Sequence, residues 1–145
     1  MLGSNRGFAI LQIVVAMTVV GLLGIWLGVS LAQQSWRNQQ REHDLDIVAG
    51  IINRYPATHY GQYPATGAAN DPGSVFAQEF TALRLIDPGT GKYFILGSNF
   101  GPCTGSPATN QPGLGYISYQ SPGESGGPYD LRVCLDSGGT YYAAD

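Results

Sequence analysis

The chain has 145 residues, of which 12% are charged, and its formal net charge is −3. This charge gives no electrostatic basis for binding of nucleic acid by the chain as a whole. A run without any charge, residues 7–36, leaves enough sequence for only one small domain.

The N-terminal part is a short, mostly polar segment, residues 1–7, followed by nearly continuous apolar sequence over residues 8–32. A helix rises about 1.5 Å per residue, so this stretch spans roughly 37 Å, which is enough to cross the core of a bilayer. The apolar stretch therefore predicts a helix that is buried in lipid or against copies of itself.

The helical pattern continues over residues 33–55 but becomes one-sided. Apolar side chains recur at three- and four-residue spacing, at Leu45, Val48, Ile52 and Tyr55. Pro56 disfavours helical backbone in the residue before it, so we expect the helix to end there. One helix over residues 8–55 is predicted, apolar all round at first and amphipathic later.

Residues 56–145 contain all nine prolines and have the turn residues of a small β-domain with variable loops. Helical spacing of aromatic and aliphatic residues predicts a short helix over 75–85. Short strands are predicted at 93–96, 115–120, 129–136 and 139–144. A small antiparallel sheet packed on the amphipathic helix gives an α+β fold.

The segment 129–136 alternates between two faces. Apolar residues, Leu131 and Val133 among them, fall on one face, and Arg132 and Cys134 fall on the other. This pattern predicts an antiparallel strand that is buried on one face only.

The chain has two cysteines, Cys103 and Cys134. Both follow a membrane-type segment, which favours an exported, oxidising setting and a single disulfide between them. Two unpaired buried thiols are the alternative.

Catalytic and metal-binding patterns are absent from the sequence, and we predict neither an enzyme nor a cofactor. The two histidines, His43 and His59, belong to no recognised motif. Carboxylates in the amphipathic segment are interpreted as a solvated helix face: Glu42, Asp44 and Asp46. Turn chemistry explains most of the later aspartates, Asp87 and Asp136 among them, better than calcium binding does, because their spacing is not that of an EF-hand.

Two ordinary interpretations of the apolar run compete. Ser30-Leu31-Ala32 offers the small residues of a secretory cleavage site, but the run is longer than the usual apolar region of about 7–15 residues. A plain single-pass anchor fits the length, while Arg6 before the span and Arg37 after it leave the orientation open.

The residues at the start of the apolar run resemble the signal of a known protein family. Arg6-Gly7-Phe8, followed by AILQIVVAMTVVGLLG, resembles the class III signal of type IV pilins and pseudopilins. The segments IDPGTGKYF and YDLRVCLDSGG loosely resemble later segments of the same family. Helix, variable loop, strands and a disulfide-closed C-terminal segment follow in the family's order, so the resemblance covers nearly the whole chain.

The resemblance implies that residues 1–7 are a leader peptide. A prepilin peptidase would cut between Gly7 and Phe8 and methylate the new N-terminus at Phe8. Before assembly the subunit would reside in the inner membrane, with Arg6 on the cytoplasmic side. An inner-membrane assembly platform would then move it into an extracellular surface filament, a fimbrium, in which copies polymerise through their stem helices.

Two departures from the family pattern concern the stem. The family usually has Glu at the fifth mature position, where it is thought to pair with the N-terminal amine of a neighbouring subunit. Here Gln12 can accept a hydrogen bond but brings no charge. Many pilins have a helix-disturbing proline in the stem, and here Gly21, Gly24 and Gly28 are the candidates for local unwinding.

The function that the resemblance implies is a structural pilus subunit with a role in adhesion, motility, DNA uptake or secretion. Nucleic acid would be at most a ligand of the finished filament. Two alternatives remain open. One is a minor pseudopilin of a type II secretion or competence machine, and the other is a membrane-anchored extracytoplasmic binding domain.

Overall fold

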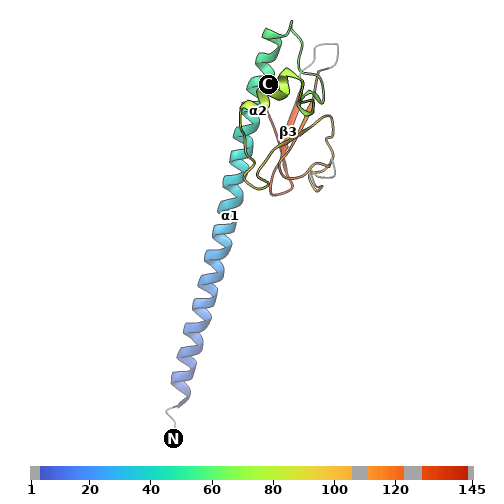
Figure 1. The fold of residues 1–145 in the computed structure, drawn as a ribbon. Coiled ribbons are helices and arrows are strands. Elements are labelled where there is room, and N and C mark those ends of the chain that lie inside the picture. The colour runs from blue at the N-terminus through green and yellow to red at the C-terminus, as the bar shows by residue number, and fades with distance from the viewer. Residues whose placement is uncertain (1–3, 106–110, 123–128, 144–145) are drawn as a thin grey trace. The chain divides into compact units, whose positions relative to one another are not determined.

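The protein is described from a computed structural model, which places residues 4–105, 111–122 and 129–143. The chain divides into two compact units, Met1–Ser35 and Trp36–Asp145. Each unit is described by itself. The first is helical, and the second contains the end of the same helix, a shorter helix and a sheet (Figure 1).

The long helix α1 (Ser4–Thr58) ends later than the sequence predicts, with Pro56 inside it. Pro56 has no backbone N–H to donate, and the helix ends two residues after it. The helix is ended by Tyr60, whose φ of 56° is left-handed, and by Gly61, whose N–H donates to the carbonyl oxygen of Pro56 at 2.8 Å. This is a Schellman-type cap. The prediction that Pro56 stops the helix was therefore wrong.

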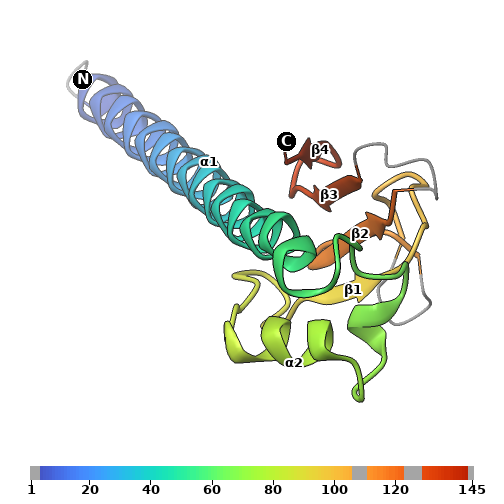
Figure 2. The ribbon, with the colours of Figure 1, turned by 90° about the horizontal axis from the view of Figure 1, so that it is seen from above.

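The four predicted strands all form, and they lie in the order β1–β2–β3–β4 (Figure 2). Their bounds are Phe94–Leu96 for β1, Tyr116–Gln120 for β2, Asp130–Cys134 for β3 and Thr140–Tyr142 for β4. The two later pairings are antiparallel as expected, whereas β1 pairs with β2 in parallel. The sheet is therefore mixed. The long connection between β1 and β2 returns the chain to the same end of the sheet, as parallel pairing requires.

The short helix α2 (Val75–Ala82) confirms the helix predicted in this region. Its start is fixed by Ser74, whose hydroxyl oxygen accepts a hydrogen bond from the backbone N–H of Ala77 at 3.0 Å. Arg84, with a φ of 51°, follows its end. A 3-10 turn, η1 (Ala68–Asn70), was not predicted.

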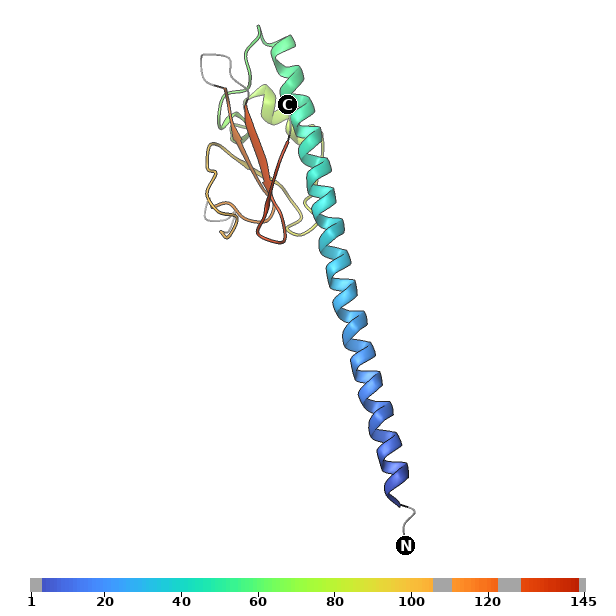
Figure 3. The ribbon, with the colours of Figure 1, turned by 180° about the vertical axis from the view of Figure 1, so that it is seen from behind.

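The core of the second unit lies between α1 and the sheet, which is seen against one side of the helix in both Figure 1 and Figure 3. The predicted helix stripe supplies one half, and alternate residues of β2 and β3 supply the other. The fully or nearly fully buried members include Leu45, Val48, Ile52, Phe76, Ile117, Tyr119, Leu131 and Val133. The α+β fold with a long N-terminal helix is confirmed.

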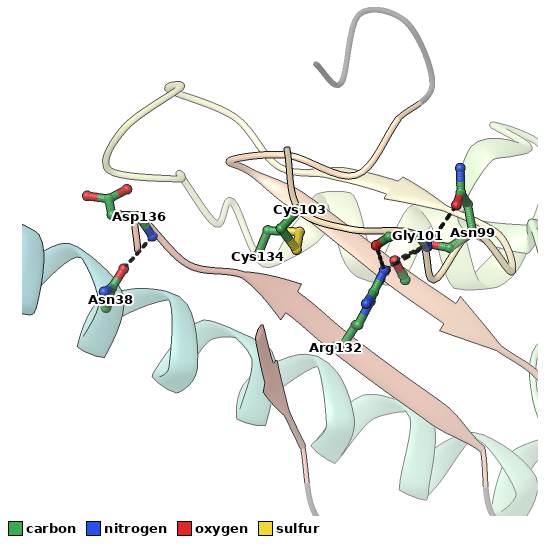
Figure 4. The surroundings of a disulfide bond; sticks show 8 residues. Asn38, Asn99, Gly101, Cys103, Arg132, Cys134 and Asp136 are labelled. Carbon is green, nitrogen blue, oxygen red and sulfur yellow. Dashed lines mark hydrogen bonds between the residues drawn. A yellow bond between two sulfur atoms is a disulfide. The ribbon is translucent and has the colours of Figure 1, made fainter. Parts of the chain in front are cut away.

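Strand β3 is buried on both faces, which corrects the half-buried strand of the prediction. Arg132 is only 4% exposed and Cys134 only 1%. The segment 97–105, which follows β1, covers this second face, and Figure 4 shows Cys103 and Gly101 of that segment over the strand. The sequence pattern could not reveal the cover, because polar turn residues make it.

Candidate functional site

The apolar part of α1 exposes its side chains along its whole length. Fifteen large apolar side chains between Ile10 and Leu31 are each 50–72% exposed. The helix has the length and composition of a membrane span, a test that a signal sequence near the N-terminus also passes. Removing such side chains from water is worth about 1.5–3 kcal/mol each, so this surface strongly favours lipid or protein around it.

Polar atoms on the apolar part are few, and two of them are satisfied by the helix itself. The Thr18 hydroxyl donates to the carbonyl oxygen of Val14 at 2.8 Å, and the Ser30 hydroxyl donates to that of Leu27 at 2.9 Å. The exposed amide of Gln12 has no hydrogen-bond partner among the described residues. In an apolar surrounding such a group is costly unless a second molecule binds it.

The three stem glycines lie in uninterrupted helix (Figure 3). A Cβ atom added at Gly21, Gly24 or Gly28 would meet nothing within 4 Å, so no packing among the described residues requires glycine there. Local unwinding at these positions is not seen in this state and stays a prediction for another one.

The predicted cleavage site lies near the start of α1. The backbone of Gly7 and Phe8 is helical, while residues 1–3 of the predicted leader lie outside the described residues. Cleavage and methylation stay predictions.

The second unit contains a buried ionic cluster that the sequence analysis missed. We call it the Arg41 cluster; its members are Arg37, Arg41, Asp87 and Asp136. The Arg41 guanidinium is fully buried, and it donates to Asp87 and to Asp136 at 2.5 Å each. Arg37 donates to the other Asp136 oxygen at 2.6 Å. The cluster joins α1 to the turn before β1 and to the second residue after β3.

Asp87 is also held by its own turn. Its Oδ2 atom accepts hydrogen bonds from the backbone N–H groups of Gly89 at 2.9 Å and Thr90 at 2.6 Å. Burial acts to raise the pKa of Asp87, but the hydrogen bonds from Arg41 and Thr90 outweigh it and leave that pKa below its ordinary value. The residues assigned to turn chemistry thus have a second role as partners of a buried cation.

The pKa values of Asp136 and Arg41 are also shifted in favour of the charged forms. Burial acts to raise the pKa of Asp136, and the hydrogen bonds from Arg41 and Arg37 more than reverse this effect. Burial acts to lower the pKa of Arg41, and the two carboxylates more than reverse that. All three groups are therefore held in their charged forms.

Asp44 corrects another prediction. It was assigned to a solvated helix face but is only 2% exposed. Its carboxylate accepts hydrogen bonds from the Tyr93 hydroxyl and the Gln40 amide, both at 2.8 Å. Burial and the Asp44 carboxylate together raise the pKa of Tyr93, which therefore stays a neutral donor.

Helical spacing contained a signal for the cluster. Arg41 precedes Leu45 by four residues and Val48 by seven, so it lies on the same buried stripe. Its two partners lie 46 and 95 residues further on, and no local pattern joins them to it.

The structure places the two histidines in different surroundings. His43 is exposed, and His59 stacks on Tyr55 with ring centroids 3.6 Å apart. Among the described residues, no three or more His, Cys, Asp or Glu side chains are grouped as a metal site would require.

The predicted disulfide is formed between Cys103 and Cys134 (Figure 4). It joins the segment after β1 to the end of β3. Comparison with models of protein families, with curated proteins and with solved structures finds no match to this chain. The family resemblance therefore depends on the sequence motifs and on the architecture alone.

Proposed function

We propose that this chain is the structural subunit of an extracellular filament of the type IV pilus kind, which polymerises through the apolar part of α1. The observation that carries the proposal is the set of fifteen exposed apolar side chains on a helix that continues into a folded, disulfide-closed domain. A soluble monomer would keep this surface in water at a large cost in free energy.

The apolar helix suits two surroundings in turn. Lipid covers it in the inner membrane before assembly, and parallel stems of other copies cover it afterwards. Cleavage between Gly7 and Phe8 by a prepilin peptidase, with methylation of Phe8, would precede the transfer. The assembly platform of the inner membrane is the partner that moves the subunit.

Gln12 is the polar position of the proposed subunit contact. Its amide is exposed, and in the apolar interior of a filament it needs a partner from a neighbouring copy. A neutral amide gives a weaker contact than the charged pair of the usual Glu.

Intact mass and N-terminal sequencing of the protein from surface filaments test the proposal directly. We expect filaments of this chain that begin at methylated Phe8. A start at Gln33 would mean an ordinary secretory signal, and a start at Met1 with protein only in membrane fractions would mean a single-pass anchor. Either result would overturn the proposal.

Processing is tested by Gly7→Trp, with Gly3→Trp in the same leader as the matched control. We expect Gly7→Trp to accumulate uncleaved precursor in the membrane and Gly3→Trp to be processed. Normal filaments from Gly7→Trp would contradict the cleavage site.

A minor pseudopilin of a secretion or competence machine is the second candidate, and the neutral Gln12 favours it, because a subunit at a tip has no further subunit above it to pair with. Quantitative electron microscopy with an antibody to this chain separates the two. Labelling along the fibres supports the main subunit, and labelling confined to fibre ends supports the minor one.

A further inference from the structure

Two residues on the same face of β3 contact the segment 97–105. Arg132 and Cys134 are two positions apart, so their side chains project to the same side of the strand. Cys134 binds this segment covalently through Cys103, and Arg132 binds it without a covalent bond (Figure 4).

Arg132 is a buried cation whose partners come mainly from this segment. Its Nη2 donates to the carbonyl oxygen of Gly101 at 2.5 Å, and its guanidinium carbon lies 5.0 Å from the ring centroid of Phe100. No carboxylate among the described residues lies within 4.0 Å of it. Its desolvation is therefore offset by the docked segment, and loss of docking would return the charge to water.

The docked segment also has hydrogen bonds that do not involve sulfur. The Ser118 hydroxyl of β2 donates to the carbonyl oxygen of Asn99 at 2.6 Å. The backbone N–H of Gly105 donates to the carbonyl oxygen of Pro112 at 2.7 Å. These bonds lie on both sides of Cys103 in the sequence, so they hold its backbone in place from two directions.

We propose that Arg132 docks the segment 97–105 on β3 before oxidation and so holds the Cys103 thiol beside the Cys134 thiol. Arg132 is then a positioning residue for formation of the disulfide. If the disulfide is later reduced, the contact between Arg132 and the segment 97–105 keeps the segment docked on β3.

The chemistry is ordinary thiol–disulfide exchange with a disulfide oxidant. One protein thiolate attacks the oxidant and releases one thiol, and the second protein thiolate attacks the mixed disulfide and releases the other. Two protons and two electrons leave the protein dithiol, and the oxidant gains them as two thiols. Arg132 acts only on the distance between the two sulfur atoms.

The quantity that tests the proposal is the effective concentration of the Cys103 thiol at the Cys134 thiol. A flexible connection gives effective concentrations of about the millimolar range, and ordering the reacting groups raises them by orders of magnitude. We expect Arg132→Met to lower this quantity at least tenfold and Arg132→Lys to lower it less, since Lys keeps the charge but loses the planar fork. A tenfold fall corresponds to about 30 mV in reduction potential.

The experiment uses the full-length chain in detergent micelles, equilibrated with mixtures of reduced and oxidised glutathione. Free thiols are alkylated and counted by mass spectrometry. Arg84→Met and Arg84→Lys, at an exposed arginine, are the matched controls and should leave closure unchanged. An equal closure constant in wild type and both Arg132 variants would overturn the proposal.

A second measurement avoids oxidation altogether. Hydrogen exchange of residues 97–105 is compared in Cys103→Ser/Cys134→Ser and in the same variant with Arg132→Met added. We expect protection in the double variant and its loss in the triple variant, with exchange in β2 unchanged in both. Equal loss of protection in the two variants would show that the disulfide alone docks the segment and would overturn the proposal.

Discussion

Two stretches of the same helix differ in the exposure of their apolar side chains. From Ile10 to Leu31 the large apolar side chains are exposed, whereas Leu45, Val48 and Ile52 are buried by the sheet. The second stretch also buries a full charge, Arg41, with its partners inside the same chain. The first stretch has no cover among the described residues, whereas the second is packed against the rest of its own domain.

The sharpest test of this difference is the same substitution in both stretches. Leu45→Asp puts an unpaired carboxylate into the core, and we expect the domain to lose more than about 4 kcal/mol. Leu23→Asp should leave the domain's stability within about 0.5 kcal/mol of wild type, but it should cost about 2.5–3.5 kcal/mol in membrane insertion. Urea unfolding followed by near-UV circular dichroism, and carbonate extraction of membranes, measure the two effects.

Leu45→Ala and Leu23→Ala are the controls that remove side-chain volume without adding charge. The former should cost about 2–5 kcal/mol and the latter should not change unfolding. Equal destabilisation at both positions would mean that the two stretches are not distinct.

The next largest effect is expected for Arg41→Met. Removing the guanidinium leaves Asp87 and Asp136 without their buried partner, and breaking such a pair costs about 3–5 kcal/mol. Arg54→Met, at an exposed arginine on the same helix, is the matched control. Adding Asp87→Asn to Arg41→Met should recover part of the loss in urea unfolding, and additive losses would contradict the proposed coupling.

Acid should weaken the domain through the same carboxylates. The pKa values of Asp87 and Asp136 lie below the ordinary value of 3.8 in the folded state. Their contribution is therefore fully present above pH 3.8 and is lost as pH falls through the lowered values. The free energy of unfolding, measured between pH 2 and 6, should fall less steeply below pH 4 in Asp87→Asn than in wild type. Parallel curves would argue against this assignment.

The smallest effect concerns the end of α1. Tyr60 holds left-handed backbone that costs a non-glycine residue about 1 kcal/mol, and its side chain is fully exposed. Tyr60→Gly should therefore stabilise the domain by up to about 1 kcal/mol in urea unfolding. Tyr60→Ala keeps a Cβ atom and should give no such gain.

Apart from the Cys103–Cys134 disulfide, the sequence predicted what depends on local pattern and missed what depends on distant partners. The helix stripe at Leu45 and Val48 is confirmed, and so is the buried face at Leu131 and Val133, although the other face of β3 is buried as well. The role of Arg41 and the cover over Arg132 depend on residues tens of positions away, which spacing does not encode. Pro56 does not mark the end of the helix, which lies at Thr58 before the left-handed residue Tyr60.

The separation within the Arg41 cluster has a consequence for synthesis. The two carboxylates that bind Arg41 are made 46 and 95 residues after it. At about 5–20 residues per second, the later partner follows roughly 5–20 s behind. During that interval Arg41 has neither of its buried carboxylate partners or only one of them, and the domain can close only after Asp136 has been made.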